Sequence, residues 1–174
     1  MNFSLDKSIE ILERTPLVIS ELTGNLSPDW TDNNEGGDTW NVFDVVGHLI
    51  HGDRTDWIPR AEIILSDREN KAFEPFDRFA QFEASKGKTL SQLLEEFKVV
   101  RASSIVRLRK LQITEHDLTR TGVHPTFGIV SLSQLLSTWV VHDLDHISQI
   151  SRIMARQYKE QTGPWIEFLK ILRQ

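Results

Sequence analysis

Four segments with the spacing of amphipathic helices constrain the fold more than any other feature of the sequence. Apolar residues recur at intervals of three and four in residues 5–22, 41–65, 89–111 and 131–158. Polar, turn-rich stretches separate these segments, and no internal repeat or low-complexity tract interrupts them. The pattern predicts an all-α protein, a four-helix bundle with long loops and a short C-terminal helix.

Helix-start signals support three of these segments. A side chain that can accept from the backbone, with a polar or acidic partner three residues on, is typical of a helix N-terminus. Such pairs occur as Asn41/Asp44, Thr89/Gln92 and Ser131/Gln134.

Two prolines mark expected irregularities. Pro16 should kink the first helix or start a second helical run, and Pro59 should bend the second, because proline has no N–H to donate to the preceding turn. Residues 66–88 are expected to cross the bundle in a mostly irregular conformation, and residues 162–174 to form the short closing helix.

Length and composition exclude several classes of protein. The 174 residues suit one domain, expected to span residues 1–174, with 39% apolar and 26% charged residues. A formal net charge of −5 argues against nucleic-acid binding, and no apolar run is long enough to cross a membrane. With no cysteine and no secretory signal pattern, we expect a cytoplasmic protein whose thiol chemistry would need an external thiol.

The stretch "VVHDLDHISQI", residues 140–150, places His142 and His146 four positions apart in an apolar stretch. On a helix the two rings lie one above the other on the apolar face or at its edge. Burying two imidazoles costs free energy unless their nitrogens are satisfied. A divalent metal would satisfy both, whereas hydrogen bonds to neighbours are the alternative for a pair of core histidines.

The second predicted helix could supply a third ligand. It carries a polar seam at helical spacing, formed by Asp44, His48, His51 and Thr55. Because apolar residues occur almost all round this helix, either His48 or His51 can point inward. Gly47 and Gly52 are consistent with the close approach of another helix or a ligand.

Other charged and imidazole side chains are expected to have structural or solvent-exposed roles. His116 and His124 lie in the loop before the fourth helix. Asp143 and Asp145 lie between the two histidines in sequence but point away from the apolar stripe, so we expect them on a solvated face. The basic cluster "RASSIVRLRK" is likewise expected to face solvent.

Three stretches together resemble the DinB-like superfamily of bacterial four-helix bundles, which includes YfiT-like proteins. They are "ERTPLVISEL" in the first helix, "TWNVFDVVGHL" at the start of the second, and "HPTFGIVSLSQLLSTWVVHDLDHISQI" leading into the fourth. The resemblance covers most of the chain and is weakest at residues 66–88 and at the C-terminus. It implies that three histidines from two helices bind a divalent metal, and the matching positions are His48, His142 and His146.

The resemblance also implies a function. Members act as S-transferases or isomerases that use a low-molecular-weight thiol, or are described as metal-dependent hydrolases, so we expect a metal-dependent enzyme that acts on a small-molecule substrate. Zinc or nickel is the expected ion, with iron or manganese as alternatives. Asp44 and Gln149 are candidates for groups that line the site or orient its ligands. A non-catalytic metal-binding stress-response module is the other reading, and a homodimer is expected from exposed apolar stretches such as "WIEFLKIL".

Overall fold

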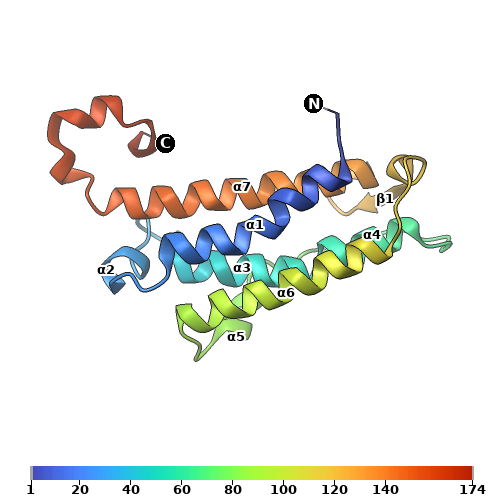
Figure 1. Cartoon of the computed structure of the whole chain (residues 1–174), viewed down its shortest axis with the longest axis horizontal. Coiled ribbons are helices and arrows are strands. Elements are labelled where there is room, and N and C mark those ends of the chain that lie inside the picture. Colours follow the sequence, from blue (N-terminus) through green and yellow to red (C-terminus); the bar gives the residue numbers. More distant parts are fainter. Residues whose placement is uncertain (1, 174) are drawn as a thin grey trace.

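The computed structural model describes residues 2–173 and confirms the four-helix bundle (Figure 1). The long helices are α1 (Leu5–Thr23), α3 (Val42–Thr55) continued by α4 (Trp57–Leu65), α6 (Leu90–Lys110) and α7 (Leu132–Arg156). Two short helices, α2 (Pro28–Thr31) and α5 (Ala80–Ser85), lie in the connections. Helix α6 packs against α1 and α3, and α7 packs against α1, α3 and α4, so both α6 and α7 bridge the other two long helices.

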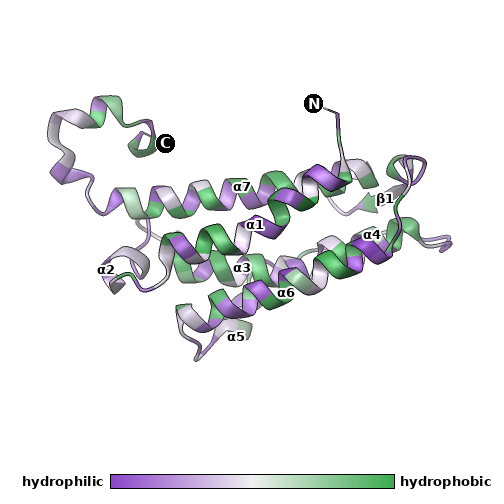
Figure 2. Ribbon diagram, in the orientation of Figure 1, coloured by the Kyte–Doolittle hydropathy of each residue, from purple (hydrophilic) through white to green (hydrophobic). Residues whose placement is uncertain are grey.

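All three predicted capping pairs form. At the start of α3, α6 and α7 the cap side chain accepts from the backbone N–H three residues on, and that residue's side chain accepts in return from the cap's own N–H. The helices between these caps are amphipathic, as the alternating purple and green of Figure 2 shows. Their apolar faces form the core, which includes Leu12, Ile58, Phe97, Leu108 and Trp139.

The prolines act differently from each other. Pro16 is buried inside α1, which continues through it without interruption and leaves the Leu12 carbonyl without its usual helical donor. The second predicted helix instead divides at Asp56, between α3 and α4. Pro59 stands at the third position of α4 and cannot donate to the Thr55 carbonyl, so the break falls one turn before the proline and not at it.

A β-hairpin is present that the sequence analysis did not predict. Strand β1 (Thr121–His124) pairs antiparallel with β2 (Gly128–Ser131), following a 3-10 turn at Asp117–Thr119. The His124 Nδ1 atom accepts from the backbone N–H groups of Thr126 and Phe127 and so stabilises the turn, which fits the expected structural role. Lys71 and Phe73 bond to Val123, which ties the segment after α4 to this hairpin.

The C-terminal segment is helical, but as 3-10 turns over Glu160–Phe168 and Lys170–Leu172 and not as one continuous helix. Gly163 has a φ of 52°, which interrupts the helical path. Among residues 2–173, no helix is both long and apolar enough to span a bilayer.

Candidate metal centre

The two central histidines of α7 and one histidine of α3 meet inside the bundle. The Nε2 atom of His142 lies 3.1 Å from the Nε2 atoms of both His48 and His146. His48 and His146 are buried and His142 is half-buried. The structure thus brings together the three histidines that the sequence singled out, and of the two alternatives on α3 it is His48 that points inward, while His51 packs on Phe76.

Hydrogen bonding alone does not satisfy this cluster. The Nδ1 atom of His146 lies 2.7 Å from the Gln149 Oε1 atom, which can only accept, so Nδ1 carries the proton and the His146 Nε2 atom presents a lone pair. The His142 Nε2 atom must then donate to His146 and has no lone pair left for His48. The Nδ1 atoms of His48 and His142 are buried without a hydrogen-bond partner.

A divalent metal fits the three Nε2 atoms. Nitrogens bound to one tetrahedral zinc at about 2.0 Å lie about 3.3 Å apart, close to the observed separations of 3.1 Å. The three ligand atoms all lie within 4.8 Å of one another. Three imidazoles leave at least one coordination position for another molecule, which is typical of catalytic and not of structural zinc sites.

The electrostatics also favour neutral imidazoles, the form that binds metals. Burial lowers the pKa of His48 to about 3 and that of His142 to about 2, and in both cases the neighbouring histidines add to the effect. Burial also lowers the pKa of His146. Neutral rings with free lone pairs are therefore available across the physiological pH range.

The two residues proposed to support the ligands lie in different settings. Gln149 bonds the His146 ring directly and fixes its orientation, as expected of a group next to a metal ligand. The Asp44 carboxylate accepts from the Asn41 N–H at the start of α3, where it forms the helix cap, and burial raises its pKa. The close approach at Gly47 is also confirmed, since an added Cβ there would lie 2.7 Å from the Ser85 Oγ atom of α5.

Two expectations about charged residues are wrong. Asp143 and Arg101, both assigned to solvated faces, are buried in the bundle centre together with Asp53. Arg101 donates to both carboxylates and also to the Leu12 carbonyl that Pro16 leaves free, which uses all five guanidinium N–H groups. A charge in a low-dielectric interior requires such partners, whereas Asp145 is exposed as expected.

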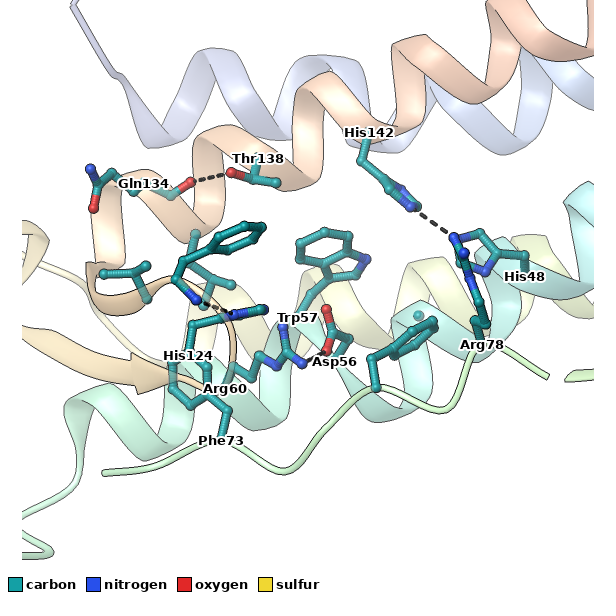
Figure 3. A pocket seen from close by; sticks show the side chains of 15 residues that line it. His48, Asp56, Trp57, Arg60, Phe73, Arg78, His124, Gln134, Thr138 and His142 are labelled. Carbon is teal, nitrogen blue, oxygen red and sulfur yellow. Dashed lines mark hydrogen bonds and ion pairs between the residues drawn. The ribbon is translucent and has the colours of Figure 1, made fainter. Parts of the chain in front are cut away.

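A cavity of about 330 Å³ opens beside the histidines (Figure 3). His48 and His142 lie at one end and His124 of the hairpin at the other, with the Trp57 ring between them. Phe127 also lines the cavity and stacks on His124. Much of the wall is apolar or aromatic. The volume falls in the range of small-molecule sites, about 300–1,000 Å³.

Several lining residues were not predicted from the sequence, among them Asp56, Trp57 and Arg78. Asp56 and Trp57 stand at the break between α3 and α4, where the sequence pattern indicated one bent helix. Burial raises the pKa of Asp56 to about 6, against the opposing effect of its ion pair with Arg60. Arg78 comes from the irregular segment after α4, whose side-chain directions no periodicity specifies.

Comparisons with known proteins agree with the fold. The DinB superfamily model matches residues 11–150. One relative is a protein of Oceanobacillus iheyensis, which its name assigns provisionally to the metal-dependent hydrolases. The two sequences are 22% identical over 159 residues, and the match covers 90% of this chain and 89% of the relative. The structure of YfiT from Bacillus subtilis, described as a probable metal-dependent hydrolase with an unusual four-helix bundle topology, matches with a TM-score of 0.73 and 23% identity. That match covers 92% of this chain and 90% of YfiT.

Proposed function

The chain belongs to the DinB superfamily, and from that premise we propose that it is a metal-dependent enzyme for small molecules, with the ion held by His48, His142 and His146. The observation that carries the proposal is the convergence of three Nε2 atoms at the end of a cavity, with no hydrogen-bonding pattern that satisfies them. Zinc or nickel is the proposed ion, because both accept three imidazoles readily.

The residues around the site have separate tasks in this proposal. A divalent ion with a free position makes a thiol or a water molecule bound there more acidic. Gln149 holds the His146 ring in the orientation that presents its Nε2 lone pair. Trp57 and the aromatic cavity wall exclude water from a bound substrate. Asp56, whose raised pKa lies near neutrality, is positioned on the same wall to exchange a proton.

Two reaction classes use such a site. The first is S-transfer, in which a low-molecular-weight thiol from outside the chain attacks an electrophilic substrate, since the chain itself has no cysteine. The second is hydrolysis, supported by the names given to the relatives from Oceanobacillus iheyensis and Bacillus subtilis. Both place the reacting atom at the histidine end of the cavity.

The metal is tested first. Protein purified without an affinity tag is stripped with a chelator and titrated with zinc and nickel, and metal content is measured by mass spectrometry. We expect about one equivalent of bound ion, with loss of binding in His48→Ala and retention in His51→Ala, which removes the neighbouring imidazole of the same helix. Uptake below about a tenth of an equivalent would contradict the proposal.

Turnover is tested on the loaded protein. A panel of bacterial thiols with electrophilic acceptors is run beside a panel of esters and amides, with His48→Ala as the control for background reaction. Metal-dependent consumption of thiol supports S-transfer, and metal-dependent product formation without thiol supports hydrolysis. Metal binding without turnover in either panel would contradict the enzymatic function and favour a non-catalytic metal-binding module.

A further inference from the structure

The cavity beside the histidines contains two arginines with different surroundings. Arg60 is buried, lies 2.7 Å from the Asp56 carboxylate and also bonds the Glu74 carbonyl. Its charge is therefore neutralised by the protein itself. Arg78 also lines the cavity but is exposed, and within residues 2–173 no carboxylate forms an ion pair with it.

Arg78 stands next to the histidine cluster. Its guanidinium group lies over the Trp40 ring, 5.9 Å from the centroid, and the Trp40 and His48 ring centroids are 4.9 Å apart. Figure 3 shows the Arg78 side chain rising beside His48 at the end of the cavity. A stacked guanidinium has a restricted position but keeps its in-plane N–H donors free for a ligand.

The rest of the cavity offers mainly aromatic and aliphatic surface. Trp57, Phe73 and Phe76 line it, as does Phe127, which stacks on His124 of the hairpin. With Asp56 and Arg60 paired and the lining histidines neutral, Arg78 leaves one net positive charge on a wall that is otherwise uncharged and mainly apolar. Such a surface is complementary to a molecule with one anionic end and an apolar body.

We propose that this cavity binds a small carboxylic acid with an apolar body, and that Arg78 holds the carboxylate and sets this specificity. A carboxylate matches a single guanidinium in charge and in its two parallel hydrogen bonds, whereas a phosphate carries more charge than one arginine neutralises. The inference rests on the proposed function only in placing the reacting part of this acid near His48 and His142. Arg78 is a specificity residue, and it binds the acid without the ion.

The test measures binding directly on metal-free protein. The probes are 4-phenylbutyrate and its primary amide, which has nearly the same shape without the charge, and binding is followed by tryptophan fluorescence, since Trp57 lines the cavity. We expect the acid to bind about tenfold more tightly than the amide. Arg78→Gln should abolish this preference while leaving amide binding unchanged.

A matched control separates a local contact from a change in overall charge. Arg68 is exposed on the same irregular segment and does not line the cavity, so Arg68→Gln removes one positive charge and should retain the preference for the acid. Equal affinity for acid and amide, no binding of either probe, or equal effects of the two substitutions would overturn the proposal.

The two proposals fail separately. A protein that takes up no metal but keeps the Arg78-dependent preference contradicts the metal-dependent function and leaves the acid site standing. A protein that binds one equivalent of zinc and shows no preference for the acid contradicts the acid site alone.

Discussion

Two polar clusters lie in the interior of the bundle and both include residues of α3 and α7, but their hydrogen-bonding groups are satisfied in opposite ways. The first, the Arg101 cluster, consists of Arg101, Asp53 and Asp143, and each of its guanidinium donors has an acceptor supplied by the chain. The second, the histidine cluster, consists of His48, His142 and His146, and its three Nε2 atoms point at one another. His142 and Asp143 are consecutive residues, so the two clusters adjoin each other on α7.

The difference shows which part of the interior is structural and which part is available for a ligand. A buried charged group with all its hydrogen bonds made holds helices together and needs nothing further. A buried group of neutral imidazoles whose facing nitrogens cannot all be satisfied by one another is incomplete until a cation is added. The Arg101 cluster has a formal charge of −1, so it also contributes a negative potential near the position where such a cation would bind.

The largest expected effect comes from breaking the Arg101 cluster. Arg101→Met leaves two buried carboxylates and the Leu12 carbonyl without a donor, and we expect a loss of about 3–5 kcal/mol in the free energy of unfolding. Denaturant unfolding measures this loss. Arg107→Met, on the exposed side of the same helix, removes a surface ion pair and should cost less than about 1 kcal/mol.

Equal costs for the two arginine variants would show that the cluster is not a structural centre. A further variant that also carries Asp53→Leu and Asp143→Leu should recover much of the lost stability, because apolar residues then replace the whole cluster and leave no unpaired charge.

Acidification acts on the histidine cluster in the metal-free protein. Burial holds the pKa of His142 at about 2 in the folded state, below its ordinary value of 6.5, so the unfolded chain takes up the proton first. The contribution of this neutral ring to the free energy of unfolding is fully present above about pH 6.5. It falls by about 1.4 kcal/mol for each pH unit as the pH drops toward the folded-state pKa. His142→Asn should show a correspondingly shallower fall in the free energy of unfolding between pH 6.5 and 4.5, and an unchanged slope would contradict the burial of a neutral ring.

The two clusters also differ in how far the sequence revealed them. His142 and His146 were recognisable because two imidazoles four positions apart on an apolar stripe are unusual, and the capping pairs were recognisable because they are local. Arg101 also lies on such a stripe, four residues after Phe97 and seven before Leu108, and Asp143 lies four after Trp139. The solvated face expected for Asp143 rested on its angle from His142 and His146, and that expected for Arg101 on the charge of its cluster, whereas the apolar residue one turn earlier indicates the buried side in both cases.

The rest could not be read from one sequence for physical reasons. What permits Arg101 to be buried is a set of partners on three other helices, including a carbonyl freed by Pro16. No local pattern records such long-range pairs. Arg78 lies in an irregular segment, where no repeating pattern indicates the direction of a side chain. The hairpin itself consists of two four-residue strands, too short for a clear alternation.

The link between the clusters can be tested at Asp143. Asp143→Asn removes a buried negative charge and weakens one side of the Arg101 cluster, so we expect a loss of about 1–3 kcal/mol in stability. We also expect zinc to bind of order tenfold more weakly, measured by calorimetry, because the potential near the histidines becomes less negative. Asp145→Asn removes an exposed charge from the same turn and serves as the control. Unchanged zinc affinity in Asp143→Asn would show that the two clusters act independently.

The smallest expected effect comes from Gln149, and it tests whether this residue orients the His146 ring or only packs against it. Gln149→Leu removes the acceptor from the His146 Nδ1–H and leaves that ring free to rotate, so zinc should bind about tenfold more weakly with little change in the stability of the metal-free protein. Gln149→Glu keeps an acceptor oxygen at the same place and should restore tight binding, because a carboxylate orients the ring and increases its basicity. If Leu and Glu at this position weaken zinc binding equally, Gln149 is only a packing residue, and the histidine cluster, like the Arg101 cluster, is oriented by the bundle itself.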